Sequence, residues 1–205
     1  QDNNPYVVIE EDILAGVPRG EWVRTVKDNL RQKFPNGVTV GRNVIEIDKQ
    51  SRREMTFSNY MQRLMRTDRQ IFADKLRATN NADEILRAAR NWVNEALLHP
   101  RRDAIIDFAR GEVLMRIGSN DYAAQVIVGN RGGGNLLLYD IINLEQTEIQ
   151  EKRTGTDFKD IQIKGNKEDF DGLRFFNGGW KRNFWDNFPS KEEIKSYIKM
   201  KNGIK

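Results

Sequence analysis

Hydrophobic positions change their spacing along the chain, and this change predicts helices first and strands later. Residues 21–34 carry an apolar side chain at every fourth position, which indicates an amphipathic helix. A helical pattern also covers residues 52–98, and two capping-box pairs within it indicate a division into two or three helices. The last of these helices is expected over residues 82–98, with Trp92 on its apolar face.

The spacing changes to two after residue 107, where three segments alternate between apolar and polar residues. These predicted strands cover residues 108–118, 121–129 and 135–144. Links rich in Gly, Ser and Asn join them, which favours tight turns and antiparallel pairing. Further strands are expected at residues 5–13, 38–47 and within 147–165. The predicted fold is therefore α+β, with N-terminal helices followed by an antiparallel β-meander of three to four strands.

Alternation along these strands predicts which side chains share a face of the sheet. In the first strand, Glu112 and Arg116 share the face opposite to the apolar residues. In the third strand, strict alternation places Ile142 with the core and Ile141 beside Tyr139 on the opposite face. If helices cover one face of the sheet, the other face displays polar residues, namely Glu112, Arg116, Gln125 and Tyr139.

Length and charge suggest a single domain with an appendage. The chain has 205 residues and a net charge of +4, and residues 151–205 account for this positive excess. We expect residues 1–150 to form the α+β domain. Residues 151–205 are expected to form a basic, aromatic-rich extension that packs on this domain or binds a partner.

Composition excludes several kinds of chemistry. The sequence has no cysteine and one histidine, which excludes disulfides, a thiol nucleophile and a multi-histidine zinc site. The remaining options are carboxylates, hydroxyls, Lys, Arg and His99, with or without a hard metal such as magnesium. Of these options, we expect a site without metal or cofactor. No apolar run is long enough to span a membrane and no signal peptide is visible, so we expect no membrane partner. The expected location is the cytoplasm, or a target cell into which the protein is delivered.

Several polar side chains have the chemistry that metal-free RNA cleavage requires. This reaction needs a base for the 2′-hydroxyl proton, an acid for the leaving oxygen and cations near the phosphate. His99 is a natural acid or base, because the reference pKa of histidine lies near neutrality, and Glu112 is a candidate partner base. The candidate catalytic residues are His99, Arg110, Glu112, Arg116, Tyr139 and Thr147.

Structural roles are alternatives for the same residues. A histidine at the C-terminus of a helix, as expected for His99, also acts as a cap, because its cation favours the helix dipole. Glu112 and Arg116 on one strand face are also expected to form a surface ion pair. The glycine-rich segment 131–135 lacks the phosphate-loop pattern and joins two strands, which favours a hairpin loop.

Basic residues near the predicted helix end and in the extension are candidates for contact with nucleic acid. In the extension, basic side chains alternate with aromatic rings that can stack on bases or pack on protein. The candidates for nucleic-acid binding are Arg101, Arg102, Lys181, Arg182 and Trp185.

Four segments of the chain resemble a module of large polyvalent proteins from phages and other mobile elements. They are residues 5–40, 68–86, 99–129 and 136–149. Such modules are similar to the barnase, EndoU, colicin E5/D and RelE-like nuclease group. The resemblance implies helices followed by a four-stranded meander, and it supports the arginines at 101, 110 and 116 with His99, Tyr139 and Thr147 as candidate site residues. One difference is that the histidine here precedes the sheet, whereas in a barnase-like pattern it follows.

The resemblance implies a metal-independent ribonuclease that serves as a toxin or effector of a mobile element. The expected substrate is RNA, with tRNA as one candidate, and an immunity or partner protein is a further expected partner. A non-catalytic module that binds nucleic acid or protein is the alternative, because no carboxylate or histidine has a recognisable catalytic spacing. An ADP-ribosyltransferase is a third possibility, although the sequence shows no convincing nicotinamide-binding arrangement.

Overall fold

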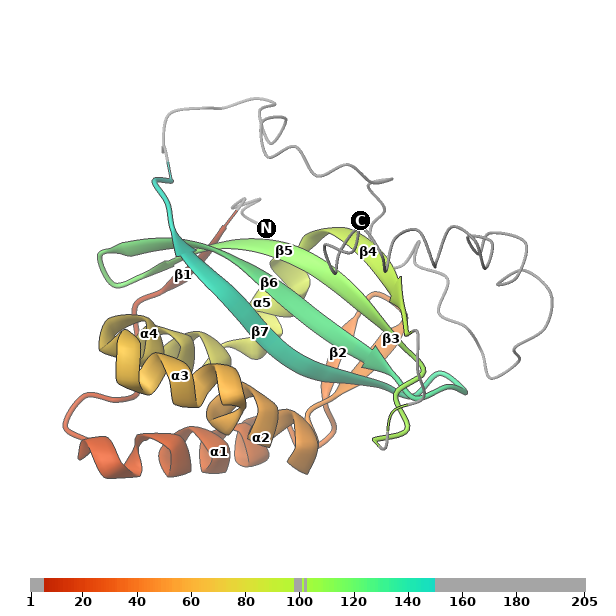
Figure 1. Cartoon of the computed structure of the whole chain (residues 1–205), viewed down its shortest axis with the longest axis horizontal. Coiled ribbons are helices and arrows are strands. Elements are labelled where there is room, and N and C mark those ends of the chain that lie inside the picture. Colours follow the sequence, from red (N-terminus) through yellow and green to blue (C-terminus); the bar gives the residue numbers. More distant parts are fainter. Residues whose placement is uncertain (1–5, 98–100, 102, 150–205) are drawn as a thin grey trace, which may run out of the picture.

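The computed structural model describes residues 6–97, 101 and 103–149. Within these residues the protein is α+β, as predicted: helices pack on one face of a curved, mixed sheet of seven strands (Figure 1). The proposed extension, residues 151–205, lies outside the described residues. The same applies to five predicted site residues, His99, Arg102, Lys181, Arg182 and Trp185.

Five α-helices precede the long strands. They are α1 (Trp22–Lys33), α2 (Lys49–Phe57), α3 (Asn59–Thr67), α4 (Arg69–Asn80) and α5 (Ala82–Ala88), and a 3-10 turn, η1 (Arg19–Glu21), leads into α1. Three of these helices start where a side chain accepts a hydrogen bond from a backbone N–H three residues later. The capping residues are Asp48 for α2, Ser58 for α3 and Asp68 for α4.

The strands form a sheet in the order β1-β5-β6-β7-β3-β2, with β4 also paired to β5. Their bounds are β1 (Val7–Ile9), β2 (Val38–Val40), β3 (Asn43–Glu46), β4 (Arg90–Ala96), β5 (Asp107–Ile117), β6 (Asn120–Asn130) and β7 (Leu136–Gln146). The three long strands β5, β6 and β7 pair antiparallel. The prediction of a purely antiparallel meander of three to four strands is nevertheless wrong, because β1 pairs with β5 and β3 pairs with β7 in parallel.

The predicted helix over residues 82–98 is also wrong, since α5 ends at Ala88 and residues 90–96 form β4. The reason is a tertiary contact between the Trp92 indole and Gly111 of β5. A Cβ at Gly111 would lie 2.7 Å from the indole ring, so only glycine leaves room for it. Trp92 is almost fully buried there. Burial of this large side chain against β5 outweighs the helical periodicity of the local sequence.

Among the described residues, the helices cover one face of the sheet, as Figure 1 shows for α1 to α4 beside the long strands. Burial alternates strictly along β5, with odd-numbered residues in the core and even-numbered residues on the opposite, open face. In β7 the alternation breaks, because Tyr139 is an extra residue between the pairs Val128–Leu138 and Ile127–Asp140. The prediction for this strand is therefore corrected: Ile141 lies in the core and Ile142 is only partly buried.

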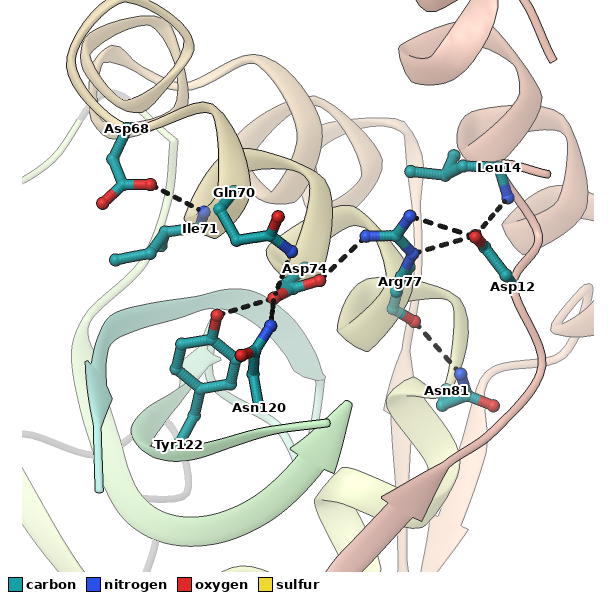
Figure 2. A network of polar contacts seen from close by, with 10 residues as sticks. All are labelled: Asp12, Leu14, Asp68, Gln70, Ile71, Asp74, Arg77, Asn81, Asn120 and Tyr122. Carbon is teal, nitrogen blue, oxygen red and sulfur yellow. Dashed lines mark hydrogen bonds and ion pairs between the residues drawn. The ribbon is translucent and has the colours of Figure 1, made fainter. Parts of the chain in front are cut away.

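A buried carboxylate fastens the helical layer to one end of the sheet (Figure 2). Asp74 of α4 is 1% exposed, and its Oδ2 accepts hydrogen bonds from the Tyr122 hydroxyl at 2.6 Å and the Asn120 amide at 3.2 Å. Its Oδ1 accepts one from Arg77 at 2.8 Å, and Arg77 also donates to Asp12 in the N-terminal segment. These bonds join the N-terminal segment, α4 and β6. They also satisfy the polar atoms of Asp74, which burial would otherwise leave unpaired.

A second polar contact crosses the core between α4 and β7. The Lys75 ammonium is fully buried and lies 2.6 Å from Asp140 Oδ1, and it also donates to the Met55 carbonyl at 2.9 Å. Burial raises the pKa of the Asp140 carboxyl and lowers the pKa of the Lys75 ammonium, while the opposite charge beside each group reduces both shifts. Removing one partner alone would leave the other as an uncompensated charge.

We expect Lys75→Met alone to lower the free energy of unfolding by about 3–5 kcal/mol, because Asp140 then stays buried without its counter-charge. The double variant Lys75→Met, Asp140→Asn should recover a large part of this loss, since it removes both charges. Urea unfolding measures both. Lys33→Met, which breaks a more exposed pair with Asp83, is the matched control and should cost at most about 1 kcal/mol. Equal losses in the single and double variants would contradict the coupling.

We expect Asp107→Asn to stabilise the protein at neutral pH. The Asp107 carboxylate is 3% exposed, and among the described residues its oxygens make no hydrogen bond of good geometry. This burial raises the pKa of Asp107, and the neighbouring Asn130 side chain only partly opposes the shift. The folded state therefore keeps this proton to higher pH than the unfolded chain does. Burial of the charged Asp107 carboxylate destabilises the fold. This effect is absent below the pKa of Asp107 in the unfolded chain, about 4, and grows as pH rises through its pKa in the folded state.

Thermal unfolding at pH 7 and at acidic pH measures this effect. The Asn variant should melt about 2–4 °C higher than the wild type at pH 7, the shift that ~1 kcal/mol gives in a domain of this size. The difference should shrink towards zero near pH 3.5, where both states of the wild type are protonated at this position. Asp28→Asn on the exposed face of α1 is the control for the loss of one surface carboxylate. A pH-independent difference for Asp107→Asn would exclude the proposed titration.

Candidate functional site

A pocket of about 170 Å³ lies on the open face of the sheet, where β4, β5, β6 and β7 come together. Its apolar lining includes Ala88, Leu114 and Ala123. Its polar lining consists of Arg90, Asn91, Glu112, Gln125, Asn143 and Glu145. One guanidinium, three amides and two carboxylates therefore surround a single cavity and offer both donors and acceptors.

Two β-bulges build this pocket. In β4, Asn91 and Trp92 both lie opposite Gly111, and in β7, Asn143 and Leu144 both lie opposite Ala124. The first residue of each bulge is an asparagine in the left-handed region, with φ of 54° at Asn91 and 53° at Asn143. Asparagine adopts this conformation more readily than most residues. Bulges of this kind redirect a side chain out of the regular pleat, and both asparagines line the pocket.

Hydrogen bonds hold the polar groups of the pocket in place. The Asn91 amide donates to Glu112 Oε2 at 3.0 Å. The Gln125 carbonyl oxygen accepts from Arg110 at 2.8 Å and from the Asn143 amide at 2.9 Å. These bonds leave Glu112 Oε1 without a hydrogen bond to any described residue, so one carboxylate oxygen is available for a proton or a donor from a ligand.

Arg90 of β4 lies directly opposite Glu112 in the strand register. Both side chains line the pocket. The exposed Arg90 guanidinium donates to the backbone carbonyls of Arg87 at 2.7 Å and Ala89 at 3.0 Å. It forms no ion pair with a carboxylate of the described residues. Its positive charge therefore remains available to an anionic ligand.

Three of the arginines that the sequence analysis selected lie within the described residues, and each of these three is paired with a carboxylate. The ion pairs are Arg101–Asp103 at 2.8 Å, Arg110–Glu95 at 2.8 Å and Arg116–Asp121 at 2.7 Å. The expected Glu112–Arg116 pair is not formed, because Asp121 lies directly opposite Arg116 in the β5–β6 register. A phosphate at any of these three arginines would compete with a carboxylate that is already bound.

The selected residues fall into three groups along the open face. Glu112 lines the pocket, Arg110 donates to the pocket residue Gln125, and Arg116 lies further along β5. Tyr139 lies towards the other end of the face and accepts a hydrogen bond from Arg101 at 2.7 Å. Burial raises the pKa of Tyr139, with a further contribution from the Glu54 charge. Thr147 is exposed just beyond β7, where its backbone N–H donates to the Asp121 carbonyl.

Four polar pocket residues, Arg90, Asn91, Asn143 and Glu145, escaped the sequence analysis as candidates. Arg90 and Asn91 fall within the segment predicted to be helical, and only the contact between Trp92 and Gly111 reveals that this segment is a strand. Asn143 was expected on the open face beside Tyr139, but nothing in the sequence marked the bulge that directs it into the pocket. A local signal for β4 does exist, since Trp92 and Val93 are residue types that strands favour.

Searches for a metal site and a membrane-spanning helix, and comparisons with known proteins, gave the following results. Within residues 6–97, 101 and 103–149, no group of three or more His, Asp or Glu side chains is arranged to hold a metal ion. Among the same residues, no helix combines the length and apolar character that a membrane crossing requires. Comparison of the chain with family models, with curated proteins and with solved structures gave no match.

Proposed function

We propose that this protein is a metal-independent endoribonuclease, of the kind used as a toxin or effector by mobile elements, with its active site in the pocket on the open face. The observation that carries this proposal is the direct pairing of Arg90 with Glu112 at the pocket. Among the described residues, the Glu112 carboxylate keeps one oxygen without a hydrogen bond, and the Arg90 guanidinium that lines the same pocket has no carboxylate partner. This combination supplies a base and a phosphate-binding cation in one cavity.

The proposed reaction is transesterification at a phosphodiester. Glu112 accepts the proton of a ribose 2′-hydroxyl, and the 2′-oxygen attacks the adjacent phosphorus. The bond from phosphorus to the 5′-oxygen breaks, which leaves a 2′,3′-cyclic phosphate and a 5′-hydroxyl. Arg90 stabilises the negative charge on the phosphate oxygens, and the amides of Asn91 and Gln125 orient the reacting groups. His99 remains the candidate acid that protonates the 5′-oxygen, and it lies outside the described residues.

The second candidate function is a module that binds nucleic acid or protein without cleaving it. The ion pairs of Arg101, Arg110 and Arg116 favour this alternative, because they neutralise three of the cations expected to act on a phosphate. The two functions differ in one measurable property: only the nuclease depends on the ionisable group of Glu112.

We expect the full chain to cleave total tRNA in the presence of EDTA, and Glu112→Gln to lower the cleavage rate by about 100-fold or more, as loss of a general base does. Gel electrophoresis of the products measures the rate, and end-group analysis should show a 2′,3′-cyclic phosphate. Glu84→Gln is the matched control, because Glu84 is an exposed glutamate on α5 outside the pocket lining.

Two outcomes would exclude the nuclease. One is the absence of cleavage by the wild-type chain at micromolar concentration, which would favour the binding module. The other is an equal rate for Glu112→Gln and Glu84→Gln, which would show that the cleavage arises elsewhere.

A further inference from the structure

An aromatic cluster joins β5 to β7 on the open face, outside the pocket lining. Phe108 of β5 and Tyr139 of β7 contact edge to face, with ring centroids 5.0 Å apart and an interplanar angle of 68°. The Arg101 guanidinium lies over both rings, 5.3 Å from the Phe108 centroid and 5.4 Å from the Tyr139 centroid. Both rings are partly exposed, and Arg101 is exposed. We call these three residues the stacking cluster.

A glycine in β6 and a bulge in β7 allow these two rings to come together. Between β5 and β7, the strand β6 places Gly129 directly opposite Phe108. A Cβ on Gly129 would lie 3.0 Å from Leu137 and 3.1 Å from Ile105, so the position admits no larger residue without displacement. Tyr139 is the extra residue of the β7 bulge, which turns its ring towards Phe108. The contact between Phe108 and Tyr139 therefore depends on the backbone geometry of the β7 bulge.

Polar bonds hold Arg101 over the rings. Its guanidinium forms a two-bond ion pair with Asp103, at 2.8 and 3.0 Å, and donates to the Tyr139 hydroxyl at 2.7 Å. Asp103 in turn accepts from Gln50 of α2 at 2.9 Å. Asp103 and the Tyr139 hydroxyl thus fix the guanidinium, and the Arg101 side chain remains exposed.

We propose that the stacking cluster binds a nucleobase of single-stranded RNA, next to the pocket in which the RNA is cleaved. This inference rests on the proposed function. Unpaired bases stack on aromatic rings and on arginine planes, and such stacking tolerates all four bases because each has a π face. The cluster presents both kinds of surface in one place.

The strand geometry relates the cluster to the pocket. Phe108, Arg110 and Glu112 are alternate residues on the open face of β5. Four residues of extended strand separate the Cα atoms of Phe108 and Glu112 by about 13 Å. An extended RNA segment lying along β5 therefore places one base on the cluster while the phosphate of a nearby nucleotide reaches Arg90 and Glu112 in the pocket.

Binding of a non-cleavable oligonucleotide tests this inference separately from catalysis. The probe is a fluorescein-labelled 2′-O-methyl RNA of ten nucleotides, which has no free 2′-hydroxyl, and the comparison probe has the same length and charge but lacks bases. Fluorescence anisotropy with the full chain should show about tenfold tighter binding of the probe that carries bases. This comparison uses only the wild-type protein, so it does not depend on the folding of a variant.

Variants of the cluster provide the second arm. Phe108→Leu and Tyr139→Leu should each weaken binding of the base-containing probe by about tenfold and leave binding of the abasic probe unchanged. Tyr139→Phe keeps the ring and should bind nearly as the wild type does. Phe57→Leu is the matched control, since Phe57 is 49% exposed on α2 and lies outside the cluster. Thermal unfolding of each variant confirms that it is folded.

The outcomes separate this inference from the nuclease proposal. Equal affinity for the two probes, or unchanged binding by folded Phe108→Leu and Tyr139→Leu, would overturn base stacking even if tRNA is cleaved. Base-dependent binding that these variants weaken would support stacking even if no cleavage is found. Failure to bind either probe would overturn stacking, and a protein ligand would then be the remaining occupant of this face.

Discussion

The whole arrangement depends on a sheet that helices cover on one face, while the other face is partly exposed along β5 and buried around Ile105 and Leu137. Along β5, alternate residues must be apolar to pack on the helices, and the residues between them are then free to be charged or aromatic. The eleven residues of β5 therefore have two roles, because one set builds the core and the other builds the functional face. The buried carboxylate of Asp74 and the Lys75–Asp140 pair hold the helices to the same strands that display the pocket.

Bulges determine where on this face a ligand can bind. A regular pleat would space the polar side chains evenly, but three local insertions in β4 and β7 gather them instead. Asn91 and Asn143 line the pocket from two of these insertions, and Tyr139 joins the stacking cluster from the third. Two of the three non-glycine residues with positive φ in the described part of the chain belong to the pocket. Such concentration of unfavourable backbone geometry is typical of functional sites.

The sequence was informative where structure depends on local pattern. The spacing of apolar residues located α1, and alternation with turn residues located β5, β6 and β7. The prediction failed at β4, because residues 90–96 fit a helix locally and only Gly111, nineteen residues away, makes room for Trp92. It failed also for Ile141 and Ile142, since one extra residue in β7 reverses the faces that follow. Alternation placed Arg110 and Glu112 on one side of β5, but it carried no information on which carboxylate each arginine would meet.

The edge of β5 has an arrangement with a consequence for association between molecules. β1 pairs with Met115–Ile117, and β4 pairs with the earlier part of the same strand, so two segments from opposite ends of the helical region share one border. Each covers a stretch of backbone that would otherwise present unpaired N–H and C=O groups. Local opening of the three-residue strand β1 would uncover such a stretch, to which a second chain could add in register. The short N-terminal strand is therefore a guard against aggregation as well as a part of the sheet.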